Sequence, residues 1–409
     1  MIGHINYMQL AASSLVINVI AIPQVAGMGM TVAMSPLIAI ANGRNDVLTA
    51  SKILFNGFVL CALTAFLLAG CLVYYKDILL HLGQDPAVSR LALPYFEIIA
   101  WSLVPMLIFM SVKQFTDALE FTKTAMLLTV LSLPVNAFLN WVFIFGRLGM
   151  PRLELYGAGI ATFITRILMA VILIIIVLSH RTFKPYMKVR QNAWKLKIAV
   201  WKELLRIGIP SSMQYGMESA AFSVSGIMIG WLGATAQAAH QIALNLASAT
   251  FMAALGLSMG GSIRVANAYG RGENNVVRII GKSTIAGALS YGTFCAVLFI
   301  TLRSYLPYLF TDNTVVAATA GSLLIFGALF QVSDTSQAIA VGLLRGIKDV
   351  KLPTAFVGIA YWIIGIPTGY FLAFELKLGA SGIWIGFVAG LTVSSVLLNA
   401  RFLSKTKNR

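Results

Sequence analysis

The chain has 409 residues, of which 58% are hydrophobic and 11% are charged. Soluble globular domains are about 45–50% apolar and about 25% charged, so this composition excludes a soluble globular protein. The net charge of +16 comes from basic residues that lie between apolar segments rather than on an aromatic-interleaved face, so we expect no nucleic-acid partner. The sequence predicts an all-α protein that crosses a membrane several times.

Apolar stretches of about 20 residues or more predict transmembrane helices, because the strands of a membrane barrel are nearer 10 residues and alternate apolar with polar side chains. Eleven such stretches follow one another, at residues 8–41, 53–75, 92–116, 125–145, 157–178, 207–231, 238–267, 283–303, 319–344, 354–374 and 380–403. The longest hydrophilic connection separates five of them from six. We therefore expect an N-terminal bundle over residues 1–180, a basic linker over 181–206 and a C-terminal bundle over 207–409.

The lysines and arginines predict the orientation, because they collect on the cytoplasmic side of membrane proteins. One side of the predicted bundles carries 23 of them and the other carries six, with Arg166 left inside a helix. The richer side is expected to be cytoplasmic, which places the C-terminus in the cytoplasm. We expect a multi-pass protein of a bacterial inner membrane. The linker has Trp194 and Trp201 among lysines, which is typical of a segment on the membrane surface. A lipid-headgroup or partner site is the alternative.

The two halves of the chain repeat each other at an offset of 227 residues. In this register Gly29 falls on Gly256, and the pair Gly43-Arg44 falls on Gly270-Arg271. Such duplicated halves are common in transporters. The sixth stretch, 207–231, has no counterpart in the first half of the sequence. At the same offset, its counterpart would precede Met1. We expect a six-plus-six architecture whose first helix is missing from the sequence; a functional protein of eleven helices is the alternative.

Two acidic residues lie near the middle of predicted spans, where a charge costs about 2.5–3.5 kcal/mol on insertion scales. Glu218 and Asp334 both stand among small and polar neighbours, which suit a water-filled cavity better than lipid. No basic residue of the same half stands at matching depth in the sequence, so the pair is expected to bind a cation or to take up protons. This predicts a Na⁺ or H⁺ site, and an inter-helix hydrogen bond is the alternative.

Two pairs of polar residues are spaced one helical turn apart, so that the members of each pair face the same way. They are Asn136 with Asn140, and Gln241 with Asn245. Contact between helices and a ligand site are both compatible with this spacing.

The sequence gives little support for an enzyme. Gly256-Leu-Ser258-Met-Gly260 matches the nucleophile-elbow pattern, but it lies in the middle of a predicted helix without the strand and turn that the elbow needs. Zinc-protease and phosphate-loop motifs are absent from the sequence. The three cysteines lie in apolar stretches without ligand spacing, so we expect neither a disulfide nor a metal site from them.

Several spaced motifs together resemble the multidrug and toxic compound extrusion (MATE) transporters of the NorM-like branch. They are His240-Gln-Ile-Ala-Leu-Asn245, Ser262-Ile-Arg264-Val with Gly270, Gln331 with Asp334 and Gln337, Leu344-Arg345-Gly346 with Asp349, and Tyr156-Gly-Ala-Gly159-Ile-Ala-Thr162. The resemblance covers nearly the whole chain. It implies two six-helix bundles around a cavity that opens alternately to either side, and export of small organic cations or drugs driven by inward Na⁺ or H⁺. A monomer suffices for that mechanism, and no cofactor beyond the coupling ion is implied.

The resemblance also assigns roles to residues. The two acids of the family's cation site correspond to Glu218 and Asp334, which could bind Na⁺. The family's polar site in the N-terminal half normally includes an acid on the first helix, which this sequence lacks. The position of Asn140 is Asp in some relatives. The substrate cavity is expected to include Asn136, Asn140, Thr162, Tyr215, Gln241, Asn245, Phe330 and Gln331. Tyr215 and Phe330 would give apolar or cation–π contact. A lipid-linked oligosaccharide flippase of the same superfamily and a membrane-embedded enzyme are the alternatives.

Overall fold

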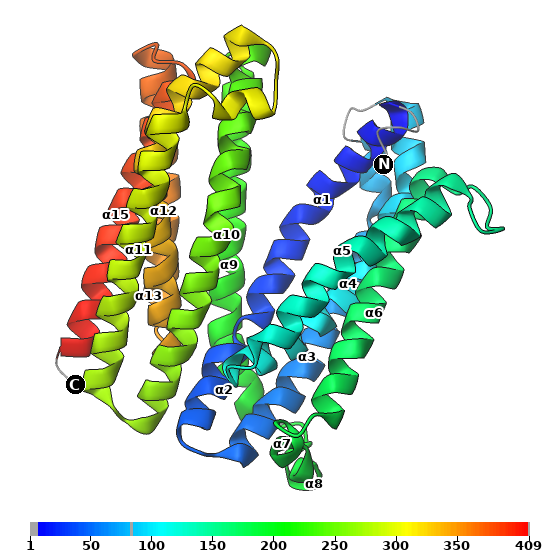
Figure 1. Cartoon of the computed structure of the whole chain (residues 1–409), viewed down its shortest axis with the longest axis vertical. Helices are drawn as coiled ribbons and strands as arrows, with labels where there is room; N and C mark the ends of the chain where they lie inside the picture. The colour runs from blue at the N-terminus through cyan, green and yellow to red at the C-terminus, as the bar shows by residue number, and fades with distance from the viewer. Residues whose placement is uncertain (1–6, 82–84, 408–409) are drawn as a thin grey trace. The chain divides into compact units, whose positions relative to one another are not determined.

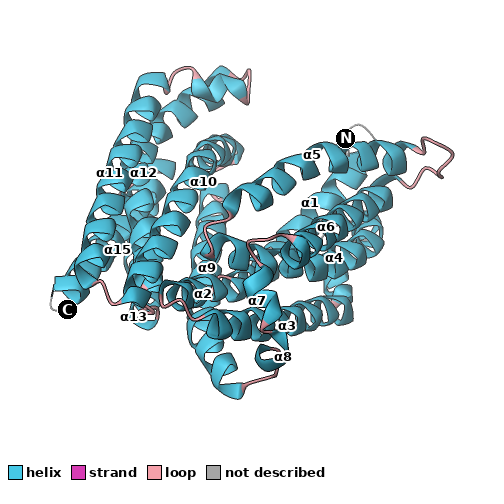
Figure 2. Ribbon diagram, turned by 60° about the horizontal axis from the view of Figure 1, so that its bottom comes forward, coloured by secondary structure: helices cyan, strands magenta, loops and turns pink. Residues whose placement is uncertain are grey.

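The computed structural model describes residues 7–81 and 85–407, and within these ranges the chain forms helices and connections without a β-strand (Figures 1 and 2). It divides into two compact units, Met1–Ser212 and Met213–Arg409. The predicted all-α fold is confirmed.

The helices of the first unit begin and end at recognisable capping residues. The Asp46 side chain accepts a hydrogen bond of 2.9 Å from the backbone N–H of Thr49, and Asp85 caps the next long helix just before Pro86. Gly146 ends another helix in the left-handed conformation. The elements are α1 (Tyr7–Thr31), α2 (Met34–Gly43), α3 (Val47–Tyr74), the 3₁₀ helix η2 (Lys76–His81), α4 (Pro86–Ala118), α5 (Thr122–Phe145), α6 (Glu154–Ser179), α7 (Lys184–Lys188) and α8 (Arg190–Ala193).

A long helix, α9 (Ile198–Gly230), continues from the first unit into the second, because the boundary between the units falls after Ser212. The predicted linker over 181–206 is therefore shorter than expected, and its last nine residues are the first turns of α9. The other elements of the second unit are α10 (Ala234–Arg271), α11 (Asn274–Leu302), η3 (Leu306–Leu309), α12 (Thr314–Gly346), α13 (Lys351–Ile359), η4 (Ala360–Gly365), α14 (Ile366–Tyr370), η5 (Phe371–Glu375) and α15 (Ala380–Lys407).

The span predicted over 354–374 is a composite helix. It runs from Lys351 to Glu375 through the π-helical segments η4 and η5, which flank α14 and Pro367. Proline lacks the N–H that an α-helix needs, and local π-helical widening is one way in which a helix absorbs such a defect.

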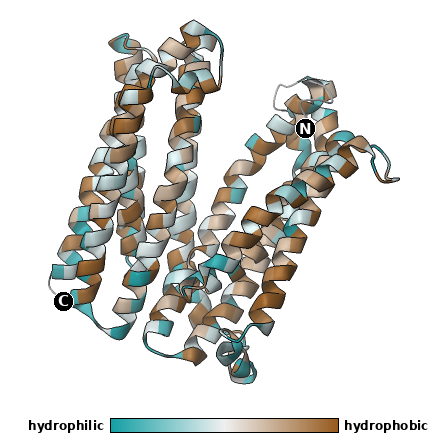
Figure 3. Ribbon diagram, in the orientation of Figure 1, coloured by the Kyte–Doolittle hydropathy of each residue, from teal (hydrophilic) through white to brown (hydrophobic). Residues whose placement is uncertain are grey.

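Ten helical segments within the described ranges are long and apolar enough to cross a membrane. Figure 3 shows their apolar residues along the helices and hydrophilic residues at the connections. The eleventh prediction, 207–231, lies in α9, which has 33 residues and is long enough but is not among the ten. The physical reason is its polar content between Ser211 and Ser223, which includes Gln214 and Glu218.

The internal repeat is visible in the order of the helices. α11 begins at Asn274, 227 residues after α3 begins at Val47, and α12 begins at Thr314, 228 residues after Pro86 of α4. The register found in the sequence is thus the register of the helices.

In the second unit, α15 packs closely against the composite helix through a row of glycines. A Cβ built at Gly386 would lie 2.5 Å from the carbonyl oxygen of Gly365 and 2.5 Å from Cα of Gly369. Small residues let two helix backbones approach in this way, as the spacing of Gly382, Gly386 and Gly390 indicates. The close contact holds the wall of the unit together.

We expect Gly386→Ala to destabilise the protein by about 1–3 kcal/mol, because the added methyl group overpacks a backbone contact. The matched control is Gly287→Ala in α11, where nothing lies within 4 Å of the added Cβ. That variant should instead be stabilised by up to about 1 kcal/mol through helix propensity. Thermal unfolding of the purified chain in detergent measures both, and equal shifts for the two variants would contradict the close contact.

Candidate functional site

The two acids predicted to form the cation site line one small cavity in the second unit. Glu218 comes from α9 and Asp334 from α12, with α10 as the third wall, and the volume is about 30 Å³. The lining residues are Gln214, Tyr215, Glu218, Phe251, Leu255, Ser258, Asp334, Gln337, Ala338, Val341 and Arg345. A drug-sized ligand needs roughly 300 Å³ or more, whereas about 10–15 Å³ already holds one water. The cavity therefore suits an ion or a water molecule rather than a drug.

Close contact between α10 and α12 shapes this cavity. The Ser258 hydroxyl on α10 donates a hydrogen bond of 2.6 Å to the carbonyl oxygen of Ala338 on α12. One turn beyond the cavity, a Cβ at Gly346 would lie 2.7 Å from the carbonyl oxygen of Ser262. Only glycine permits this approach, so the two helices present their polar residues to a narrow common space.

Two glutamine side chains hold the carboxylate of Glu218. Gln214, one turn earlier on α9, donates from Nε2 to Oε1 over 3.1 Å, and Gln337 of α12 donates to the same oxygen over 3.3 Å. Asp334 is only 6% exposed. Hydrogen bonds from neutral amides occupy the acceptor atoms of a carboxylate but do not neutralise its charge, so the ionised site still attracts a positive charge.

A basic residue, Arg345, also lines the cavity of the two acids, eleven residues beyond Asp334 on α12. Counting along the sequence places this arginine on the cytoplasmic side, but it belongs to the last turn of α12, is 6% exposed and lines the same cavity. Its guanidinium carbon lies 5.6 Å from the centre of the Tyr215 ring. Sequence reasoning missed this neighbour, although the spacing from Asp334 is three helical turns and puts both on one face.

The chemistry of the lining fits a hard cation. Besides two carboxylates, the Gln337 side-chain oxygen is buried and has no hydrogen-bond partner within the described part of the chain. Oxygen ligands of this kind suit hard cations. No cluster of three or more His, Cys, Asp or Glu side chains occurs among the described residues.

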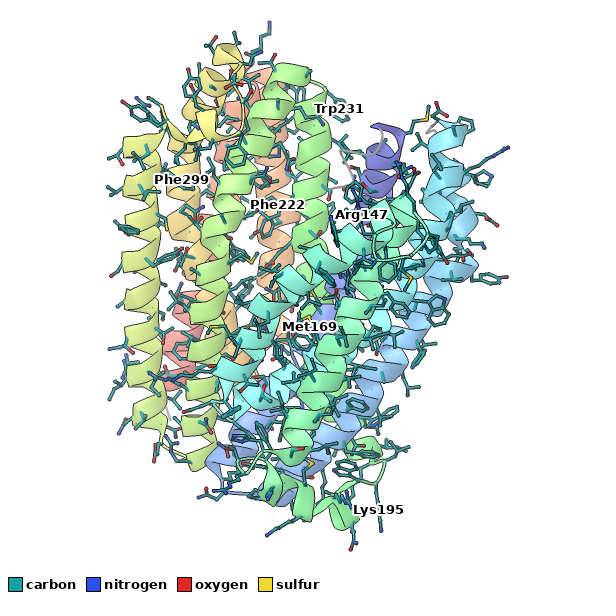
Figure 4. The ribbon with its side chains drawn as sticks, turned by 45° about the vertical axis from the view of Figure 1, so that its right-hand side comes forward. Arg147, Met169, Lys195, Phe222, Trp231 and Phe299 are labelled. Atoms are coloured by element: carbon teal, nitrogen blue, oxygen red, sulfur yellow. The ribbon has the colours of Figure 1, made fainter. Side chains whose placement is uncertain are left out.

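The aromatic residue predicted just ahead of Asp334 lies in an apolar cluster. The ring of Phe330 is 6.1 Å from that of Phe222 and 5.6 Å from that of Trp384, and Phe222 is seen among the helices of the second unit in Figure 4. Gln331 is fully buried, and both polar atoms of its amide are without a partner within residues 7–81 and 85–407. Neither side chain lines the cavity of the two acids.

The predicted polar site of the first unit is a chain of hydrogen bonds between α5 and α6. Asn140 donates to Asn136 over 2.9 Å, and Asn136 donates to the hydroxyl of Thr165 over 3.2 Å. Thr162 instead bonds the carbonyl oxygen of Ala158 in its own helix. Thr165 is thus a partner that sequence reasoning missed, while Asn136 and Asn140 are brought together as their spacing indicates.

The second predicted pair also faces one way. Gln241 donates a hydrogen bond of 3.1 Å to Asn245, and both side chains are exposed on α10 rather than packed into the second unit. They are available to a ligand or to another helix.

The MatE family model matches residues 1–142 and 210–371. The chain belongs to the MATE family. The probable multidrug resistance protein NorM of Mesorhizobium japonicum is 32% identical to it over 100% of this chain and 88% of the relative. The multidrug resistance protein NorM of Vibrio vulnificus (strain CMCP6) is also 32% identical, over 98% of this chain and 89% of its own length.

Solved MATE structures share the fold. The eukaryotic MATE transporter AtDTX14 superposes with a TM-score of 0.88 at 22% identity, and a MATE transporter in complex with MaL6 superposes with a TM-score of 0.91 at 19% identity. Each comparison covers 100% of this chain and 91% of the solved one. The two-bundle MATE fold predicted from the sequence is therefore confirmed.

Proposed function

We propose that this MATE protein is a multidrug efflux transporter of the bacterial inner membrane, in which inward Na⁺ or H⁺ drives the export of organic, cationic amphiphilic compounds. The names of its NorM relatives support drug export. The observation that carries the coupling is the cavity shared by Glu218 and Asp334, which has room for an ion and not for a drug. The excess of Lys and Arg on one side supports a cytoplasmic C-terminus.

The charges of the cavity suggest a stoichiometry. Two carboxylates and the guanidinium of Arg345 leave one net negative charge when all three are ionised. One monovalent cation, either Na⁺ or H⁺, neutralises that charge. A neutral cavity costs less to close away from water than a charged one.

Exchange then follows from linkage between two ligands. The cation stabilises the conformation in which its site can close, and a positively charged substrate favours the conformation with the ionised site. Each ligand shifts the equilibrium against the state that the other needs. Asn136, Asn140, Gln241 and Asn245 are the polar residues proposed to contact the substrate, and Tyr215 and Phe330 are its proposed aromatic contacts. One chain is sufficient for this cycle.

The test is substrate efflux from vesicles that contain the purified chain, under an imposed Na⁺ or H⁺ gradient. We expect an inward gradient of one of the two cations to drive the export of ethidium or norfloxacin. For one-for-one electroneutral exchange, a tenfold gradient supports at most about a tenfold concentration ratio of the drug. Dissipation of the gradient by an ionophore should abolish the ratio. Export that proceeds equally without either gradient would refute the coupling.

A further inference from the structure

The first unit contains an apolar cavity that the transport site does not use. Its volume is about 300 Å³, which is at the lower end of the size of small-molecule sites. All of its lining residues are apolar or aromatic, and they come from α3, α4, α6 and the linker: Leu54, Phe55, Phe58, Val112, Ile174, Val177, Leu178, Met187 and Trp194. Leu178 is 50% exposed, so the cavity reaches the surface of the unit.

The linker is fixed to the bundle and completes the cavity wall. The fully buried Asn56 of α3 donates a hydrogen bond of 3.1 Å to the carbonyl oxygen of Lys195 and accepts one of 2.9 Å from the N–H of Lys197. The Ser51 hydroxyl donates to the carbonyl oxygen of Tyr186 over 2.9 Å. These hydrogen bonds hold Met187 and Trp194 against the helices, so specific contacts fix the wall of the cavity.

Trp194 combines an apolar wall with a free donor. Its ring stacks on Phe55 with centroids 5.5 Å apart and planes 12° from parallel. The indole N–H is buried and has no partner within the part of the chain that the structure describes. Tryptophan favours the membrane–water interface for this reason, because one side of the ring is apolar and the other carries a donor.

The surface around the cavity is basic and amphipathic. The segment from Arg181 to Arg206 has eight Lys or Arg residues against the single acid Glu203. Lys184, Lys188, Lys195 and Lys197 are exposed, and Lys195 projects from the linker at the end of the unit (Figure 4). Between and beside them, Leu196 and Ile198 are 64% and 76% exposed. Exposed apolar side chains among lysines are typical of a segment that dips into an anionic membrane surface.

We propose that the cavity holds an acyl chain of an anionic phospholipid from the cytoplasmic leaflet, and that the linker lysines bind its phosphate headgroup. Charge complementarity argues for this occupant, since a cationic drug would be repelled by the same lysines. An apolar cavity does not hold water well, whereas a lipid chain fills it from the bilayer. The proposal uses the orientation proposed above and is independent of the ion coupling.

The test uses Trp194 as a local reporter of the lipid in the cavity. The full chain is placed in phosphatidylcholine vesicles that contain a small, equal fraction of either phosphatidylglycerol or phosphatidylcholine with brominated acyl chains, which quench nearby tryptophans. The emission lost in Trp194→Phe isolates the signal of this ring. We expect brominated phosphatidylglycerol to occupy the site at least fivefold more strongly than brominated phosphatidylcholine. Equal quenching by the two lipids would overturn the proposal.

Matched variants separate the headgroup from the chain. Because each lysine near an anionic membrane contributes roughly a fivefold preference, Lys188→Gln with Lys195→Gln should remove most of the selectivity. The control, Lys405→Gln with Lys407→Gln in the exposed last turns of α15, should keep it. Trp101→Phe should remove a component that both lipids quench alike, since this exposed ring of α4 does not line the cavity. Unchanged selectivity in the linker variant would refute the headgroup contact.

The role of the cavity is tested by chain length and by competition. Val177→Phe places a larger side chain in the cavity and should reduce the quenching of Trp194. In the wild-type chain, unbrominated dioleoyl phosphatidylglycerol should restore the emission, whereas dihexanoyl phosphatidylglycerol, with the same headgroup, should not. Equal displacement by both would show a headgroup site alone, and displacement by norfloxacin would show a drug site. Either result would overturn the lipid assignment.

Discussion

Asp334→Asn and Glu218→Gln should each reduce gradient-driven efflux by at least about 100-fold, to the background rate. The amides keep the volume of the acids but neither carry a negative charge nor take up a proton. A carboxylate about 5 Å or less from the bound cation contributes roughly 3 kcal/mol to its binding at an effective dielectric constant of about 20, which corresponds to that factor. Both acids line the cavity that we propose for the cation, so the loss should be similar for the two variants. Efflux of the proposed drugs from vesicles under the driving gradient is the measurement.

The amide variants must be shown to fold before the loss of efflux is assigned to the cation site. Their elution on size-exclusion chromatography and their thermal unfolding should match those of the wild-type chain, since the substitutions preserve shape. Glu273→Gln is the matched control, because this acid forms an exposed ion pair of 2.9 Å with Arg271 outside the cavity. It should transport at the wild-type rate. Wild-type efflux by either cavity variant would exclude that acid from coupling.

The elements that the sequence predicted well are those that local physics determines. The length of an apolar stretch sets a span, and the cost of a charge in the bilayer draws attention to Glu218 and Asp334. The internal repeat needed only a comparison of the chain with itself. The sequence predicted a linker over 181–206 and a span over 207–231, because composition separates the basic first turns from the polar and apolar residues of what is one continuous helix, α9.

The features that the sequence did not predict depend on contacts between distant segments. Thr165 is 29 residues from Asn136 and becomes its partner only when α5 and α6 pack together. The linker was expected on the membrane surface from its composition, but the cavity beneath it depends on hydrogen bonds to Asn56, which is buried in α3. The packing of α10 against α12 likewise places Arg345 in the lining of the cavity that the two acids share.

Arg345→Gln should increase the apparent affinity for the coupling cation by about tenfold or more and reduce the rate of efflux. With the guanidinium present, the ionised cavity has one net negative charge; without it, the cavity has two. At an effective dielectric constant of about 20, loss of a positive charge anywhere within about 10 Å of the bound cation changes the binding energy by more than about 1.4 kcal/mol, which corresponds to tenfold. A cation held this tightly leaves slowly, which limits the cycle.

The charge, rather than the shape, of Arg345 is expected to set this affinity. Arg345→Lys keeps the positive charge but loses the flat guanidinium beside Tyr215, so its cation dependence should stay close to that of the wild-type chain. The measurement is the cation concentration that gives half-maximal efflux from vesicles, determined for both variants and for the wild-type chain. If Arg345→Gln and the wild-type chain gave the same half-maximal concentration, Arg345 would have no part in balancing the charge of Glu218 and Asp334. A shift in Arg345→Gln that is absent in Arg345→Lys would instead mean that the positive charge of this arginine neutralises part of the charge of the two acids, and that the coupling ion neutralises the rest.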